Sequence, residues 1–384
     1  MNIAIKKVMF FLLIPVLINI LPISCSYEDD PAESEIISTE ASDFVRDMGI
    51  GINIGNSLDA INNRASPTPL GETGWGNPLI NLDYIQALKN FGFKSIRLPV
   101  TWAEYLGKAP DYTIEPERMN RVAEVVDWIL GEDMYCIINL HHDGGDSPGS
   151  WIKNFQNNEE EIGNMFVKVW QQIAGHFMNY SNKLIFESMN EVGFNSGYKE
   201  ERYRKMNKLN QLFVDTVRAS GANNAVRYLL IAGFWTDIDQ TTDPLFLIPN
   251  DPVANRQIIS VHYYTPSQFT IASSTGSGYG YRDNWGNDER EAADHAALER
   301  NFQKLIDRFI VKGIPAVIGE YGVVKTNKVE EGRIKWLTAV TKICLDNGIC
   351  PMFWDNGNGE VIIRRSLPYR KSSTLDAVWE NLAL

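Results

Sequence analysis

The chain has 384 residues, a formal net charge of −12 and 44% hydrophobic residues. The negative charge argues against nucleic acid as a partner, because phosphate binding needs clustered Lys and Arg side chains. Four cysteines without a CxxC spacing give no sign of a zinc site.

The N-terminus has the pattern of a secretory signal. Lys6 and Lys7 precede a run of 16 mostly apolar residues, 8–23, which is too short to span a bilayer comfortably. Ser24 and Cys25 follow, and this ending resembles a bacterial lipobox, in which the Cys becomes the lipidated first residue. We predict a lipoprotein signal peptide over 1–24, with membrane attachment only through Cys25. An ordinary signal peptide with an incidental Cys is the alternative.

Residues 25–40 are predicted to form a flexible acidic tether. They contain too little apolar surface to fold on their own. Acidic residues so close to the Cys resemble the surface-export signals of Bacteroidetes lipoproteins. The expected location is therefore the outer membrane or cell surface of a Gram-negative bacterium, or the secreted fraction.

Short apolar runs recur through the remaining chain and predict buried strands. Most are continuous rather than alternating, as expected of strands that are buried on both faces. The eight runs are GINIGN (51–56), SIRLPV (95–100), YCIINLHH (135–142), LIFESMNE (184–191), YLLIAGFW (228–235), IISVHYY (258–264), PAVIGEYG (315–322) and CPMFWDNG (350–357).

Segments with helical periodicity separate these runs, which predicts a single (β/α)8 TIM barrel over residues 41–384. An open dinucleotide-binding sheet is disfavoured, because no GxGxxG follows a strand. The weakest crossover is 236–257, where two prolines predict a short or irregular helix.

Polar or aromatic side chains lie at the ends of most of these strands. In such a barrel the C-terminal strand ends converge on the face that carries the active site. The candidate site residues are Asn53, Arg97, His141, His142, Asn190, Glu191, Trp235, His262, Tyr264, Glu320 and Trp354.

Glu191 and Glu320 close the fourth and seventh strands and are expected to face each other. Two opposed carboxylates are what glycosidic hydrolysis needs, one as proton donor and one as nucleophile or stabiliser. Desolvation at the end of a buried strand would raise the pKa of Glu191 and suit it to donate a proton. A purely structural pair of ion bridges to Arg97 is the alternative, disfavoured because one arginine cannot pair fully with two carboxylates from separate strands.

The pair His141 and His142 raises the question of a metal. Adjacent residues on a strand point to opposite faces, so the two rings should not share an ion. We expect no metal and no cofactor, with a hydrogen-bonding role for His141 and a supporting place for His142.

The motifs at the strand ends resemble glycoside hydrolase family 5, whose barrel enzymes carry two glutamates on strands four and seven. The matching residues are Arg97 in SIRLPV, His141 in LHH, Asn190 and Glu191 in MNE, His262 and Tyr264 in VHYY, Glu320 in IGEYG and Trp354 in FWDNG. GINIGNSLDA, ETGWGNP, VHYYTP and WDNG narrow the resemblance to subfamily 4, mostly endo-β-1,4-glucanases (cellulases) with xyloglucanases and mixed-linkage glucanases among them.

The resemblance implies a retaining double displacement on a β-glucan polysaccharide, with Glu191 as acid/base and Glu320 as nucleophile. It also implies that Asn190 bonds the sugar 2-hydroxyl, that Arg97 and Tyr264 support Glu320, and that His262 lies beside Glu191. Mannanase activity on the same site is an alternative. A surface glycan-binding lipoprotein without catalysis is a further alternative, disfavoured because a binder gains nothing from keeping both glutamates.

Aromatic residues in the long loops are candidates for sugar stacking. Trp354 is the expected platform under the sugar that is cleaved, Trp235 is expected to line the cleft, and Trp75, Trp151 and Trp285 could equally anchor their own loops. We expect a monomer. Whether Cys344 and Cys350 form a disulfide is left open by the sequence.

Overall fold

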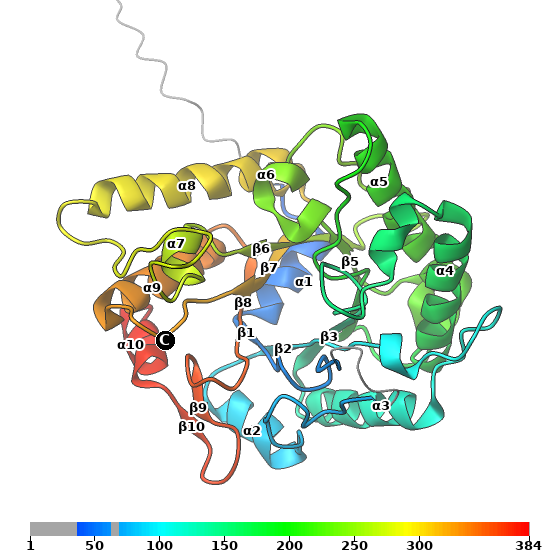
Figure 1. Ribbon diagram of the computed structural model, residues 1–384, viewed down its shortest axis with the longest axis horizontal. Coiled ribbons are helices and arrows are strands. Elements are labelled where there is room, and N and C mark those ends of the chain that lie inside the picture. The colour runs from blue at the N-terminus through cyan, green and yellow to red at the C-terminus, as the bar shows by residue number, and fades with distance from the viewer. Residues whose placement is uncertain (1–36, 63–68, 384) are drawn as a thin grey trace, which may run out of the picture. The chain divides into compact units, whose positions relative to one another are not determined.

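The computed structural model describes residues 37–62 and 69–383. The predicted signal peptide, Cys25 and most of the predicted tether lie outside them. The described chain folds into a closed barrel whose strands follow the chain order β1 to β8, which confirms the predicted fold class (Figure 1). No helix within these two ranges is long and apolar enough to cross a membrane.

The barrel strands coincide with the eight apolar runs. Neighbouring strands pair in parallel, and Gly51 of the first strand pairs with Met352 of the last, which closes the barrel. The strands are β1 (Gly51–Asn53), β2 (Ser95–Leu98), β3 (Tyr135–Asn139), β4 (Leu184–Glu187), β5 (Leu229–Ala232), β6 (Gln257–Tyr263), β7 (Ala316–Tyr321) and β8 (Cys350–Phe353).

Helices surround the barrel and pack apolar faces against it. On one of them, Phe166, Val169 and Ile173 recur at helical spacing and are buried. The helices of this layer are α2 (Leu82–Asn90), α3 (Pro116–Gly131), α4 (Glu159–His176), α5 (Lys199–Ala219), α6 (Ile238–Thr241), α8 (Glu291–Arg308), α9 (Glu330–Asp346) and α10 (Ser373–Asn381).

The weak crossover behaves as predicted. Between β5 and β6 the chain forms a 3-10 turn, Phe234–Thr236, and the four-residue helix α6. Other short elements lie in the connections. They are α7 (Ser267–Thr270), the strand pair β9 (Ile362–Arg364) and β10 (Arg370–Lys371), and 3-10 turns at Ala103–Tyr105, Ile152–Gln156, Ala222–Ala225 and Ile310–Lys312.

Helix α1 (Glu40–Met48) packs against the N-terminal ends of the strands, and Figure 1 shows it behind the barrel. Its buried residues Ala41, Val45 and Met48 join an apolar cluster with residues that begin several strands. Phe44 stacks on Tyr228 with ring centroids 3.7 Å apart. This end of the barrel is therefore apolar and filled.

Farther along the strands the buried side chains become polar. Asn53, Arg97, Asn139, Glu187 and Ser260 are each at most 1% exposed, and they come from five different strands. Buried polar groups are costly unless each finds a hydrogen-bond partner. The partners described below show that these residues support the C-terminal face of the barrel.

The question of a disulfide is answered within the described residues, where Cys136, Cys344 and Cys350 are free and buried.

Candidate active site

Arg97 lies at the centre of the site and is completely buried. Its Nη1 donates to Glu320 Oε1 at 2.7 Å and to Asn53 Oδ1 at 2.9 Å. Its Nη2 donates to Asn190 Oδ1 at 2.7 Å. One rigid guanidinium therefore fixes side chains from three other parts of the barrel rim.

Arg97 has a further partner, Glu187, that was not predicted from the sequence. Its Nε donates to Glu187 Oε2 at 2.8 Å, so Arg97 pairs with two carboxylates from separate strands, β4 and β7. The argument that one arginine could not do so is wrong, because the guanidinium offers different edges to the two anions. The signal for Glu187 was present: it is a carboxylate two residues after Ile185, whose side chain faces the barrel interior.

The two predicted catalytic carboxylates meet at His262. Its Nδ1 lies 2.9 Å from Glu191 Oε1 and 3.6 Å from Glu320 Oε2. One carboxylate oxygen of each glutamate and one ring nitrogen of His262 all lie within 4.8 Å of one another. The arrangement fits the carboxyl separation of about 5 to 5.5 Å of retaining glycosidases, whose second carboxylate acts as a nucleophile.

Tyr264 supports the same carboxylate as Arg97. Its hydroxyl donates to Glu320 Oε2 at 3.1 Å. Burial, followed by the charge of Glu320, raises the pKa of Tyr264 well above its ordinary value, so the phenol keeps its proton. Both oxygens of Glu320 are thus held by donors.

The pKa values of the two carboxylates are shifted in opposite directions, and the shift of Glu191 is opposite to the one predicted from the sequence. The Glu191 side chain is 44% exposed, whereas that of Glu320 is 7% exposed. Burial raises the pKa of Glu320, and the charges of His262 and Arg97 oppose this only in part. Burial also acts to raise the pKa of Glu191, but the hydrogen bond and charge of His262 bring it below the ordinary value. The predicted rise in the pKa of Glu191 is therefore wrong for the protein without substrate, because His262 outweighs the effect of burial.

Glu191 lies beyond the end of β4 and has a positive φ of 47°. A non-glycine residue in this left-handed region is strained, and such residues cluster at functional sites. The strain is consistent with a backbone that is bent to aim this side chain into the cleft.

Trp354 follows β8 and is partly exposed. Its ring lies parallel to that of His141, with centroids 5.9 Å apart and an interplanar angle of 9°. A Cβ atom at Gly55 would come within 2.7 Å of the Trp354 ring, so only glycine fits there. Burial holds the pKa of His141 well below its ordinary value, and the ring is therefore neutral.

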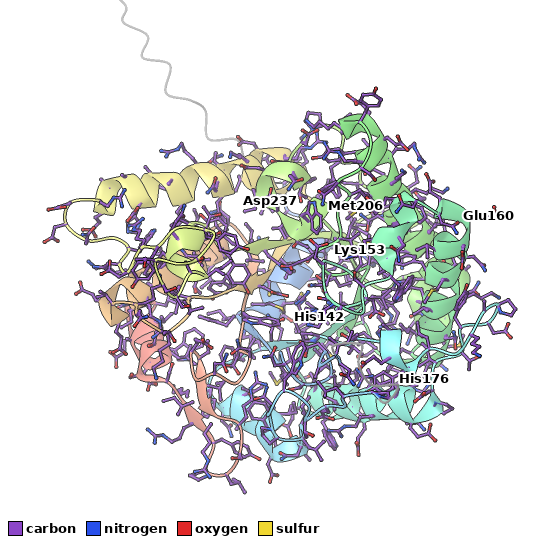
Figure 2. The ribbon with its side chains drawn as sticks, viewed as in Figure 1. His142, Lys153, Glu160, His176, Met206 and Asp237 are labelled. Atoms are coloured by element: carbon purple, nitrogen blue, oxygen red, sulfur yellow. The ribbon has the colours of Figure 1, made fainter. Side chains whose placement is uncertain are left out.

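His142 and Trp75 lie against each other next to His141. His142 Nδ1 lies 2.7 Å from Ser147 Oγ, and its ring meets the edge of Trp75 with centroids 5.4 Å apart. Trp75 is 39% exposed, which leaves its ring free to stack on a ligand. In Figure 2 His142 lies near the middle of the view, whereas His176 lies toward the outer edge, on α4.

The reason given above for excluding a shared ion at the two histidines is wrong. Both residues follow Asn139, the last residue of β3, so strand alternation does not apply to them. Their ring centroids are 4.6 Å apart, and one donor atom of each lies within 4.8 Å of a carboxylate oxygen of Asp59. Asp59 already accepts hydrogen bonds from the backbone N–H groups of Asn56 and Ser57.

The remaining loop tryptophans divide into two groups. Trp235 is partly exposed, has a φ of 54°, and packs so closely over Gly193 that a Cβ atom there would lie 2.3 Å from its Nε1. Trp151 and Trp285 are 8% and 2% exposed and therefore anchor their own loops.

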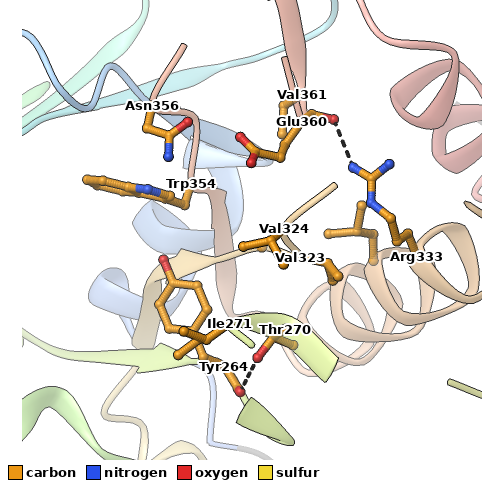
Figure 3. A pocket seen from close by; sticks show the side chains of 12 residues that line it. Tyr264, Thr270, Ile271, Val323, Val324, Arg333, Trp354, Asn356, Glu360 and Val361 are labelled. Carbon is orange, nitrogen blue, oxygen red and sulfur yellow. Dashed lines mark hydrogen bonds between the residues drawn. The ribbon is translucent and has the colours of Figure 1, made fainter. Parts of the chain in front are cut away.

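A pocket of about 260 Å³ opens beside Trp354 and Tyr264 (Figure 3). Its walls are mostly apolar, and Asn356 and Glu360 add polar groups. Burial raises the pKa of Glu360. Arg333 lies at the far side and donates to the Glu360 backbone oxygen at 3.4 Å.

A closed parallel barrel with two carboxylates this close at its C-terminal face defines the class of retaining glycosidases. The family model "Cellulase (glycosyl hydrolase family 5)" matches residues 57–360. The chain belongs to this family and is a glycoside hydrolase.

Relatives of known activity cover most of the chain. It is 37% identical to Endoglucanase A of Paenibacillus barcinonensis over 85% of both chains. A family 5 xyloglucanase from Paenibacillus pabuli is 37% identical, with a TM-score of 0.80 over 88% of this chain and 99% of that one. A family 5 lichenase from Caldicellulosiruptor sp. F32, solved with cellotetraose, is 31% identical, with a TM-score of 0.82 over 90% of this chain and 96% of that one.

Proposed function

We propose that this enzyme is an endo-acting β-1,4-glucanase that works by double displacement with retention. The observation that carries the proposal is the meeting of Glu191 and Glu320 at His262, with one oxygen of each within 4.8 Å of the other. A longer separation would leave room for the water of an inverting enzyme. The endoglucanases among the relatives support the β-1,4-glucan substrate.

In the first step a Glu320 oxygen forms a bond to the anomeric carbon while the bond from that carbon to the leaving sugar breaks. Glu191 gives its proton to the departing oxygen. In the second step Glu191 takes a proton from water, the water oxygen bonds to the anomeric carbon, and the ester to Glu320 breaks. Glu191 regains its proton in this step.

The surroundings suit these roles. Arg97 and Tyr264 hold the two oxygens of Glu320, which fixes the nucleophile below the sugar. Arg97 also donates to the side-chain oxygen of Asn190, Oδ1, which leaves the side-chain amide N–H groups of Asn190 to donate to the 2-hydroxyl of the sugar.

Substrate binding supplies the raised pKa that Glu191 needs. A bound glucan would cover the half-exposed Glu191 side chain and remove its water, and desolvation favours the protonated carboxyl. Trp354 gives an apolar face on which the reacting sugar stacks.

A second candidate substrate is xyloglucan. The pocket beside Trp354 is mostly apolar, carries Asn356 and Glu360, and is large enough for one additional sugar. The similar P. pabuli xyloglucanase supports this candidate. Mixed-linkage glucan and mannan remain alternatives on the same cleft.

The proposed cellular arrangement is a lipoprotein anchored through Cys25 at the envelope of a Gram-negative bacterium, with a monomeric catalytic domain. The lipobox-like Ser24 and Cys25 support it. Metabolic labelling with a radioactive fatty acid should mark the wild type and fail to mark Cys25→Ser. Equal labelling of the two proteins would contradict the anchor.

The deciding experiment compares wild type, E191Q and E320Q on carboxymethylcellulose, xyloglucan, lichenan and glucomannan. The wild type should release reducing ends from at least one β-glucan, and E320Q should lose activity by about 10³-fold or more, because the nucleophile is gone. A wild type that releases none but is retarded by a glucan in an affinity gel would establish the non-catalytic binder instead.

A further inference from the structure

Glu187 is a buried carboxylate to which the mechanism above assigns no part. It is the last residue of β4, four residues before Glu191, and is completely buried. Its Oε2 accepts hydrogen bonds from Arg97 Nε at 2.8 Å and from Asn139 Nδ2 at 2.9 Å. Its Oε1 accepts one from Ser260 Oγ at 2.5 Å. Donors from β2, β3 and β6 therefore hold it in one orientation.

The contacts of Glu187 decide how the charge of Arg97 is shared. Among the described residues, Arg97 is the only arginine or lysine that bonds Glu320, and it bonds Glu187 through a different nitrogen. In a buried site the attraction between charges is strong because little water screens it. Without Glu187, the whole positive charge of Arg97 would act on the Glu320 carboxylate, stabilise its electron pairs and weaken it as a nucleophile.

Glu187 also decides where the guanidinium points. Glu187 fixes the Nε edge of Arg97, and the planar group then presents Nη1 to Glu320 and Nη2 to Asn190. A rotation of the guanidinium would move both contacts together. The positions of the nucleophile and of the amide beside the acid/base residue thus depend on one carboxylate below them.

We propose that Glu187 is a positioning residue of the reaction, which orients Arg97 and balances its charge so that Glu320 is held in place yet remains an effective nucleophile. This inference rests on the proposed role of Glu320.

A purely structural role for Glu187 predicts a different set of observations. A buried ion pair that only stabilises the barrel would affect unfolding when it is altered, but it would leave the pH dependence of catalysis in place. The groups that face Glu320 are Arg97, His262, Glu191 and Tyr264, and those that face Glu187 are Arg97, Asn139 and Ser260. Arg97 is the one residue in both groups, so a change in the charge of Glu187 would affect Glu320 through Arg97.

The test is E187Q, which keeps the shape of the side chain and removes its charge. The amide oxygen can accept from Arg97 and Asn139, and the amide N–H can donate to the Ser260 hydroxyl oxygen, so every neighbour keeps a partner. The acid limb of the kcat profile, which reports the substrate complex, should move to lower pH by about one unit, because the undivided charge of Arg97 favours ionised Glu320. The plateau of kcat/KM should fall by about 10- to 100-fold, the loss typical when the partner of a site residue is removed.

The rate of nucleophilic attack is read separately with 2,4-dinitrophenyl 2-deoxy-2-fluoro-β-cellobioside. In this reaction the Glu320 oxygen bonds to the anomeric carbon as dinitrophenolate leaves, and the leaving group needs no proton from Glu191. Inactivation should be slower in E187Q than in the wild type by a factor similar to the fall in kcat/KM. The matched control is S260A, which removes a donor to Glu187 but keeps the charge, and its acid limb should stay at the wild-type pH.

An acid limb at the wild-type pH together with an unchanged inactivation rate in folded E187Q would overturn the proposal, whatever the change in thermal unfolding. A similar shift of the acid limb in S260A would also overturn it, because packing rather than charge would then be responsible. Peptide mapping of the inactivated wild type keeps the two hypotheses apart. A label on a residue other than Glu320 would refute the proposed function itself, independently of E187Q.

Discussion

At the residue scale, His262 contacts both carboxylates that we propose as catalytic. It lies between Glu191 and Glu320, brings the pKa of Glu191 below its ordinary value against the effect of burial, and opposes the rise that burial causes in the pKa of Glu320. Both carboxylates contact the same His262 ring, which lies near the end of β6. A change of this ring should therefore shift the pKa values of both carboxylates.

The change H262N should therefore move both limbs of the pH profile to higher pH. In the kcat profile, which reports the substrate complex, the acid limb follows the ionisation of Glu320 and the basic limb follows the loss of the Glu191 proton. Removing His262 raises both pKa values, and a shift of about half a unit or more is expected in each limb. Measured kcat from pH 4 to 9 checks this. A profile that stays in place or moves to lower pH would contradict the assigned cause.

Trp354 is expected to contribute substrate stacking rather than proton transfer. The change W354A should lower kcat/KM by about tenfold or more, because stacking of the reacting sugar is lost. W354F, which keeps a smaller apolar face, should lose less, and both variants should keep the wild-type limbs of the pH profile. Equal losses in the two variants would show that the ring face is not what matters.

The site residues were predictable where they end a strand, because strand ends of a barrel converge whatever the loops do. Glu187 was not predicted as a site residue, because it lies within an apolar run and only the residues at the end of that run were considered. The direction of the Glu191 pKa shift could not be predicted from the sequence either. It depends on how far the Glu191 side chain is exposed and on the His262 ring from β6, and no local sequence pattern reveals these.

At the scale of elements, helix α1 closes the barrel end opposite the active site. This helix was not predicted from the sequence, because it is short and the residues that its apolar face contacts are spread over several strands. The eight strands and the irregular crossover at α6 were predicted correctly, since continuous apolar runs and prolines act locally. The small β9–β10 pair was not foreseen, because its three-residue and two-residue strands carry too little pattern.

The change M48A tests the contribution of α1 to stability. Met48 is completely buried, so its truncation should lower the free energy of unfolding by about 2 to 5 kcal/mol. R46A on the same helix is the matched control, because the Arg46 side chain is 56% exposed and its ion pair with Asp43 is expected to contribute little. Urea unfolding followed by circular dichroism measures both variants. Equal effects would mean that α1 does not pack as described.

At the scale of the whole molecule, the buried thiols report on the integrity of the barrel. Cys136 lies in β3, Cys350 in β8 and Cys344 on the buried face of α9, and all three are free. In a Cys25→Ser protein, Ellman's reagent should find no reactive thiol under native conditions and three after denaturation. One thiol after denaturation would show that two of them are paired.

The closed barrel itself was predictable because the number and order of buried strands leave few alternatives for a chain of this size. The choice of substrate could not be predicted, because it depends on pockets such as the one beside Trp354. The walls of that pocket come from the segments that follow β6, β7 and β8 and from helix α9.

Peptide mapping of the enzyme after inactivation by the fluorinated cellobioside tests the proposed nucleophile most directly. We expect a single covalent sugar on the peptide that contains Glu320. A sugar on any other residue, or an active enzyme that the reagent never labels, would contradict this expectation.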